Sequence, residues 1–267
     1  MRRLALALAL AALPASVPAQ TSPTEAVKPI QPSKIILVGD STTAVWGGWG
    51  PSFCAYHVTS FLACINLARG GRSSGSYRAE GSWAVALNEM RVPGYQNVWV
   101  LIQFGHNDQP GKPGRSTDLR TGFPANIRRY VEETRAAGAK PVLVTPLTRR
   151  MFKDGKLDND LEPWAAAIRQ AAAEMHVPLL DLNAESVAAV QAMGPVAADR
   201  FAEVPENLAA APAASTTATE TNDQPMGPPK QSFDRTHLGV EGAHYFSAMV
   251  TRELWRAVPD IRRMLVR

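Results

Sequence analysis

The sequence lacks several patterns that would assign it to a large functional class. It has only 2 cysteines among 267 residues, and without a CxxC pair or an adjacent histidine they do not form a zinc site. It has no basic helix or stacking motif typical of nucleic-acid-binding proteins, and no GxSxG motif of the α/β-hydrolases. Beyond residue 20, no segment is apolar for long enough to cross a bilayer. The net charge of +4 is mild and suits an acidic polysaccharide or an anionic envelope as partner.

The N-terminus predicts export. Residues 1–19 contain two arginines, an apolar run of Leu and Ala, and then small residues, which is the pattern of a secretory signal peptide. The apolar run is short for the alternative, an uncleaved membrane anchor. We therefore expect a periplasmic or extracellular protein with a flexible lead-in over residues 20–33. In an oxidising compartment, Cys54 and Cys64 either form a disulfide or remain buried thiols in a helix and the next strand.

Residues 34–267 predict one α/β domain. Short apolar runs of the kind that form strands buried on both faces recur along this part of the chain. These runs span residues 34–39, 63–68, 97–105, 140–146 and 177–182. Helical patterns lie at 126–138 and 161–176, and the alternation of strands with helices predicts a doubly wound sandwich around a parallel sheet. Residues 203–232, rich in Ala, Thr and Pro, predict a long irregular loop that leads to Asp234.

Three polar residues suggest nucleophilic catalysis. A serine hydroxyl becomes a good nucleophile when an imidazole takes its proton and a carboxylate orients that imidazole. Asp234 and His237 lie three residues apart in FDRTHLGVEG, and Ser41 lies in ILVGDSTTAVW. Of the histidines, only His237 has an aspartate three positions upstream in a loop before a helix. The alternative for Ser41 is a helix N-cap, and we interpret Asp40 as a cap or loop tie.

Two further segments offer hydrogen-bond donors for an oxyanion. Gly71 lies in RGGRSSGS and Asn107 in FGHND, and their N–H groups suit the charge that develops on a carbonyl oxygen during acyl transfer. The alternatives are a flexible turn at Gly71 and a loop tie at Asn107 together with Asp108. Ser41, Gly71 and Asn107 each follow an apolar run, so we expect them to meet at the carboxyl edge of the sheet, where ligands bind in such folds.

The blocks GDSTTA, NLARGGRSS, QFGHND and DRTHL, in this order, resemble the SGNH (GDSL-like) hydrolase superfamily and, within it, the rhamnogalacturonan acetylesterase family. The resemblance covers about residues 35–250 and implies a flavodoxin-like three-layer α/β/α sandwich with a five-stranded parallel sheet. It also implies that Ser41 is the nucleophile, His237 the base and Asp234 its orienting acid. The oxyanion hole would consist of the Ser41 N–H, the Gly71 N–H and the Asn107 side chain. The long segment before Asp234 departs from the family pattern.

The predicted function is an exported carbohydrate esterase that removes O-acetyl groups from a pectic polysaccharide, with no metal or organic cofactor. Four arginines near the expected rim are candidates to pair with galacturonate carboxylates, although solvated surface or a structural ion pair is the stronger interpretation of any single one. They are Arg72, Arg78, Arg149 and Arg150. The alternatives are a broad esterase or lipase acting on small acyl esters or other acetylated glycans, and a polysaccharide-binding protein without catalysis. No feature of the sequence specifies an oligomeric state.

Overall fold

The computed structural model describes residues 29–203 and 234–267. The expected signal peptide, most of the lead-in and the expected loop at 203–232, except residue 203, lie outside the described residues. All the helices and strands reported below belong to the unit Gln31–Arg267.

A five-stranded sheet forms the centre of this unit. Its strands are β1 (Ser33–Gly39), β2 (Leu62–Asn66), β3 (Val98–Gln103), β4 (Lys140–Val144) and β7 (Leu179–Leu180). All neighbouring strands are parallel, in the order β2-β1-β3-β4-β7. A separate antiparallel pair follows β4, made of β5 (Phe152–Lys153) and β6 (Lys156–Leu157). The strands that the apolar runs predicted are therefore present and parallel; β1 is one residue longer than its run and the other four are shorter.

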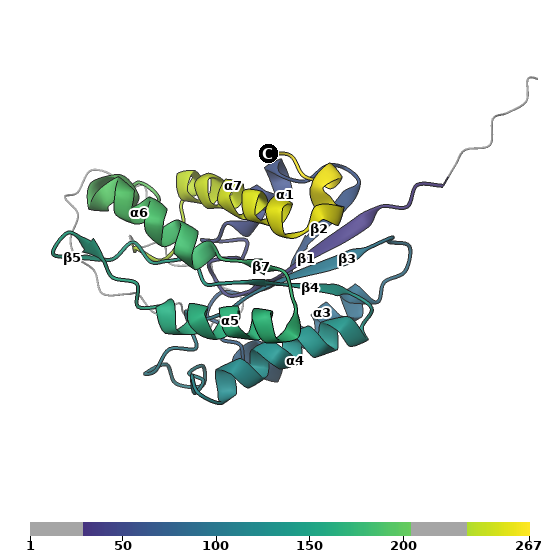
Figure 1. Ribbon diagram of the computed structural model, residues 1–267, viewed down its shortest axis with the longest axis horizontal. Coiled ribbons are helices and arrows are strands. Elements are labelled where there is room, and N and C mark those ends of the chain that lie inside the picture. Colours follow the sequence, from purple (N-terminus) through teal and green to yellow (C-terminus); the bar gives the residue numbers. More distant parts are fainter. Residues whose placement is uncertain (1–28, 204–233) are drawn as a thin grey trace, which may run out of the picture. The chain divides into compact units, whose positions relative to one another are not determined.

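Helices cover both faces of the sheet (Figure 1). They are α1 (Gly50–Tyr56), α2 (Ser76–Ala79), α3 (Ser82–Met90), α4 (Gly122–Ala136), α5 (Glu162–Met175), α6 (Leu182–Asp199), α7 (Val240–Ala257) and a 3₁₀ helix at Pro259–Met264. Side chains of β1 alternate between two cores because successive residues of a strand point to opposite faces. Ile35 and Leu37 pack with α1, α6 and α7, whereas Ile36 and Val38 pack with α3, α4 and α5. The predicted three-layer α/β/α sandwich is confirmed.

The two cysteines form a disulfide. Cys54 on α1 and Cys64 on β2 are bonded, with their Cα atoms 5.4 Å apart. The bond fixes α1 against an edge strand of the sheet. The sequence left open a disulfide or two buried thiols, and the structure has the disulfide.

The strand order positions the functional residues. Because β2 and β3 lie on opposite sides of β1, the connections after β1 and β3 diverge, and such a switch point leaves a crevice at the carboxyl ends of the strands. Ser41 follows β1 and Asn107 follows β3, so both emerge at this crevice.

Candidate functional site

Three side chains from the two ends of the chain form a hydrogen-bonded row. Ser41 Oγ lies 2.8 Å from His237 Nε2, and His237 Nδ1 lies 2.6 Å from Asp234 Oδ2. With the proton of the neutral imidazole on Nδ1, that nitrogen donates to Asp234 and leaves Nε2 to accept from the Ser41 hydroxyl. The row can therefore move a proton from the serine to the imidazole while the carboxylate holds the ring in one orientation.

Asp234 is held as a carboxylate by its own loop. Its second oxygen, Oδ1, accepts hydrogen bonds from the backbone N–H groups of Thr236 and His237, each at 2.6 Å. Burial acts to raise the pKa of the Asp234 carboxyl, but the hydrogen bonds and the charge of His237 outweigh burial and lower the pKa to about 2. Asp234 is thus ionised at neutral pH and able to stabilise a protonated imidazole.

Arg150 supports the loop that carries Asp234 and His237. Its fully buried guanidinium donates to the carbonyl oxygens of His237 at 2.6 Å, Asp234 at 3.3 Å and Thr236 at 3.4 Å. Burial lowers the pKa of Arg150 to about 10, which leaves it charged at neutral pH. The guanidinium therefore connects three successive parts of the loop through their backbone carbonyl groups.

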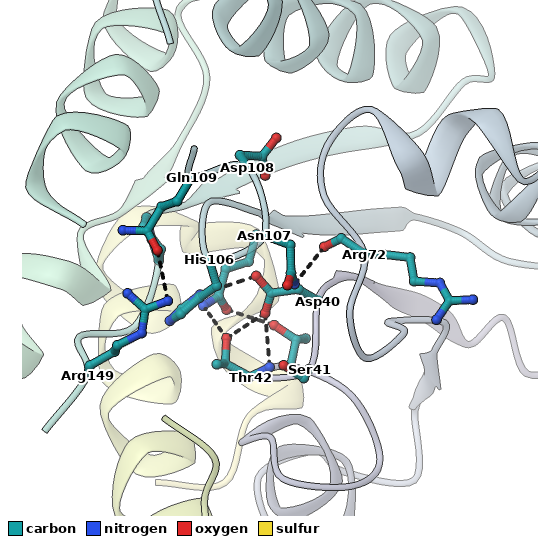
Figure 2. A network of polar contacts seen from close by, with 12 residues as sticks. Asp40, Ser41, Thr42, Arg72, His106, Asn107, Asp108, Gln109 and Arg149 are labelled. Atoms are coloured by element: carbon teal, nitrogen blue, oxygen red, sulfur yellow. Dashed lines mark hydrogen bonds and ion pairs between the residues drawn. The ribbon is translucent and has the colours of Figure 1, made fainter. Parts of the chain in front are cut away.

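The loop after β1 is fixed by Asp40. The fully buried carboxylate accepts from the Thr42 N–H at 2.9 Å and the Thr42 hydroxyl at 2.8 Å, and its other oxygen lies 3.2 Å from His106 Nδ1 (Figure 2). Burial lowers the pKa of His106, so the imidazole is neutral and donates to Asp40. Asp40 and His106 thus tie the loop that carries Ser41 to the loop after β3.

The expected oxyanion donors lie beside Ser41. Gly70 is close enough that an added Cβ would be 3.7 Å from Ser41 Cβ, and Asn107 Nδ2 donates to the Arg72 carbonyl at 3.2 Å (Figure 2). Gly71, between Gly70 and Arg72, has a φ of 77°, a conformation that favours glycine. Within the described residues, neither the Ser41 N–H nor the Gly71 N–H donates to a protein acceptor, which leaves both for a ligand oxygen.

Asp108 joins the two loops that carry these donors. It is fully buried and accepts from the Ser74 N–H at 3.1 Å, from the Ser74 hydroxyl at 2.6 Å and from the Thr117 hydroxyl. Burial raises the pKa of Asp108 to about 6, against the opposing effect of these hydrogen bonds.

The structure gives the four predicted arginines partners within the chain. Arg72 pairs with Glu80 at 2.9 Å, Arg78 pairs with Glu133 at 2.7 Å, and Arg149 contacts Asp160 and Gln109. The prediction of a substrate contact is wrong for Arg150, because its guanidinium is fully buried against backbone carbonyls. Arg72 and Arg149 lie on opposite sides of Ser41 (Figure 2).

Sequence reasoning missed two cations beside Arg149. Lys112 and Arg115 lie in the loop after Asn107, where the Ser116 hydroxyl accepts from the Lys112 N–H at 2.9 Å. Partial burial, and then the charges of Arg149 and Arg115, lower the pKa of Lys112. Their spacing in QPGKPGRST resembles that of any polar loop, so the sequence alone does not single them out.

The part of the chain that the structure describes contains neither a candidate metal site nor a candidate membrane span. Within residues 29–203 and 234–267, no group of three His, Cys, Asp or Glu side chains has an arrangement that could hold a metal ion. In the same ranges, no helix has both the length and the apolar composition of a membrane span.

The chain is similar in sequence to known proteins. The model of the GDSL-like Lipase/Acylhydrolase family matches residues 37–245. A probable rhamnogalacturonan acetylesterase of Bacillus subtilis, YesY, is 35% identical over 161 residues, which are 58% of this chain and 72% of YesY. The rhamnogalacturonan acetylesterase RhgT of the same organism is 34% identical over 182 residues, 65% of this chain and 74% of RhgT.

Solved structures share the fold. The YxiM protein of Bacillus subtilis superimposes with a TM-score of 0.62 at 21% identity over 86% of this chain, which spans 58% of that protein. The acetylxylan esterase Axe2 of Geobacillus stearothermophilus superimposes with a TM-score of 0.54 at 17% identity, over 84% of this chain and 95% of Axe2. At these identities the likeness shows the fold alone.

Proposed function

Because the chain belongs to the GDSL-like lipase/acylhydrolase family, we propose that it is a serine carbohydrate esterase that removes O-acetyl groups from an acidic pectic polysaccharide. The observation that carries the proposal is the row of Ser41, His237 and Asp234, with contacts of 2.8 Å and 2.6 Å. The names of the two curated relatives support acetylated rhamnogalacturonan as the substrate.

In the first half of the proposed reaction, His237 Nε2 takes the Ser41 proton as Oγ attacks the acetyl carbonyl carbon. The carbonyl oxygen becomes an oxyanion, which accepts hydrogen bonds from the N–H groups of Ser41 and Gly71 and from the Asn107 side chain. When the C–O bond to the sugar breaks, the imidazolium returns its proton to the sugar oxygen. An acetyl ester of Ser41 remains.

In the second half, His237 takes a proton from water, and the resulting hydroxide attacks the acetyl-serine carbonyl. The tetrahedral intermediate collapses, the Ser41 oxygen recovers the proton from His237, and acetic acid leaves and loses its proton to the solvent as acetate. Asp234 stays ionised throughout and stabilises the imidazolium formed in each half. These steps use only groups of this chain and water.

Positive charge at the rim supports an acidic polymer. Arg149 and Arg72 lie on opposite sides of Ser41 (Figure 2), and Lys112 lies close enough to Arg149 and Arg115 for their charges to lower its pKa. We propose that these cations attract galacturonate carboxylates. The disulfide between Cys54 and Cys64 supports an exported, periplasmic or extracellular enzyme, because such bonds persist in oxidising compartments.

The test compares wild type with Ser41→Ala on acetylated rhamnogalacturonan, acetylated xylan and p-nitrophenyl acetate, with acetate release as the readout. Ser247→Ala on α7 is the matched control, since that buried hydroxyl bonds to the His244 carbonyl at 2.9 Å. We expect release that needs Ser41 and strongly favours the pectic polymer. Activity on the small ester alone would leave a broad esterase, and binding of the polymer without any turnover would leave a binding protein.

A further inference from the structure

The loop that carries the proposed nucleophile also carries an exposed aromatic side chain that the reaction does not use. Trp46 is 61% exposed, as is its neighbour Val45. Single apolar side chains at the surface are common and need no explanation in themselves. The position of Trp46, and the rigidity of the backbone that carries it, distinguish it from the other exposed apolar residues.

The backbone on both sides of Trp46 is fixed. Ala44 N–H donates to the Asp40 carbonyl at 3.0 Å, and Trp49 N–H donates to the Thr42 carbonyl at 2.9 Å. The Gly47 carbonyl accepts from the Leu238 N–H at 2.8 Å. A ligand that packs on the indole therefore orders little additional backbone, and such preorganisation favours binding.

This loop lies directly against His237. A Cβ atom added to Gly47 would be 3.0 Å from His237 Cβ and 3.1 Å from its Cδ2. Two other segments that contact the His237 loop also expose apolar side chains. Met151, 41% exposed, follows Arg150, and Val240, 76% exposed, begins α7. Exposed apolar side chains thus lie on three segments that adjoin the His237 loop.

The proposed reaction places the alcohol half of the ester on the His237 side of the site. The imidazole returns its proton to the leaving alcohol, so the alcohol half of the ester must lie next to Nε2, and the acetyl oxygen must lie at Gly71 and Asn107. In a polysaccharide ester the alcohol half is a sugar ring, whose C–H groups form a flat apolar face. An indole offers a flat apolar surface of matching size.

We propose that Trp46 packs against the sugar ring that carries the acetyl group and thereby selects carbohydrate esters over small esters. This inference rests on the proposed function and extends it to a specific binding contact. Trp46 acts through binding of the alcohol half and takes no part in proton transfer.

The test compares Trp46→Ala and Trp46→Phe with wild type on acetylated rhamnogalacturonan oligosaccharides and on p-nitrophenyl acetate. We expect Trp46→Ala to lower kcat/KM for the oligosaccharide about tenfold, equivalent to about 1.4 kcal/mol, and to leave the small ester unchanged. Trp46→Phe should keep most of the oligosaccharide activity. Phe61→Ala is the control, because Phe61 is 54% exposed but precedes β2, at the amino edge of the sheet.

A binding measurement separates this inference from the esterase proposal. In the Ser41→Ala background, calorimetry with the acetylated oligosaccharide should show about tenfold weaker binding when Trp46→Ala is added. No binding in that background, an equal fall on both esters, or unchanged oligosaccharide kinetics would each overturn the inference. A fall in kcat/KM of Trp46→Ala on p-nitrophenyl octanoate alone would also overturn the inference, because Trp46 would then contact the acyl half of the ester. If wild type binds the oligosaccharide through Trp46 but releases no acetate, only the esterase proposal fails.

Discussion

At the residue scale, the position of His237 depends on a neighbour without a side chain. Gly47 has a φ of 73°, and an added Cβ would be 3.0 Å from His237 Cβ. A methyl group there would press on the imidazole while the loop around it is held by hydrogen bonds on both sides. The ring would then rotate or shift away from Ser41.

We therefore expect Gly47→Ala to lower kcat on acetyl esters by at least tenfold, because a small displacement of a catalytic base is costly. The left-handed backbone alone costs roughly 1–2 kcal/mol of stability for a residue with a Cβ. Gly138→Ala is the matched control, with a φ of 80° and no atom within 4 Å of the added Cβ. Steady-state kinetics and thermal unfolding check both variants, and an equal kcat in the two would contradict the clash with His237.

Asn107 carries a second prediction at this scale. Its side-chain N–H groups are proposed to stabilise an oxyanion, and loss of one such donor costs about 2.7–4 kcal/mol in the barrier. Asn107→Ala should therefore lower kcat by 10²–10³ with a smaller effect on KM. Asn126→Ala is the control, because that amide donates to the Ser74 hydroxyl at 3.1 Å without facing Ser41. A kcat within threefold of wild type for Asn107→Ala would remove Asn107 from the oxyanion hole.

The sequence predicted which residues form the row of Ser41, His237 and Asp234, but not which partners the arginine side chains contact. A serine nucleophile needs an imidazole, and the imidazole needs a carboxylate. The motifs that contain Ser41, Asp234 and His237 were therefore sufficient to predict that these three side chains meet. A long arginine side chain can reach many partners, and the partner that it contacts depends on residues far away in the sequence. Arg78 turns to Glu133, 55 positions away along the chain, and Arg150 turns inward to the loop carbonyls.

At the element scale, the strands were easier to predict than several helices. The apolar runs of β1, β3 and β4 are buried on both faces, which gives a strong signal. No helix was predicted for residues 182–199, where α6 begins after the cap Asp181 and contains a kink at Gly194. The predicted strand at 177–182 shrinks to two paired residues, Leu179 and Leu180, because the chain turns at the cap Asp181 into α6.

The disulfide gives a prediction about one pair of elements. Cys54 and Cys64 are 10 positions apart, and a bond that closes a loop of this size restricts the unfolded chain by about 2–3 kcal/mol. The double variant Cys54→Ala, Cys64→Ala should lose about that much free energy of unfolding in urea titrations. Its kcat at 20 °C should match wild type, because α1 and β2 contribute no reacting group. A loss below 0.5 kcal/mol would mean that the closed loop does not stabilise the fold.

At the scale of the whole molecule, two buried carboxyls connect the site to global stability. Four sequence blocks meet at one edge of the sheet, and hydrogen bonds of Asp40 and Asp108 cross between their loops, whereas Asp234 fixes the loop that carries His237. Asp108 and Asp234 have pKa values moved in opposite directions, to about 6 and about 2, from an ordinary value of 3.8. Their contributions to the pH dependence of unfolding therefore have opposite signs.

The sign for each group follows from proton binding in the folded and unfolded states. Between pH 4 and 6, folded Asp108 keeps a proton that the unfolded chain has lost, so stability falls as pH rises, by about 3 kcal/mol in total. Between pH 2 and 4, unfolded Asp234 binds a proton that the folded protein does not, so stability rises with pH by about 2 kcal/mol. Together the two carboxyls contribute most near pH 4.

The measurement is the free energy of unfolding in urea at pH 4, 5, 6 and 7 for wild type, Asp108→Asn and the exposed control Asp154→Asn. An amide does not titrate, so wild type should lose about 3 kcal/mol relative to Asp108→Asn between pH 4 and pH 7. The control should follow wild type. The size of the offset at any single pH reflects the hydrogen bonds lost or gained by the amide, whereas its change with pH reports the pKa of Asp108. An offset that stays constant across this range would show that burial does not raise that pKa.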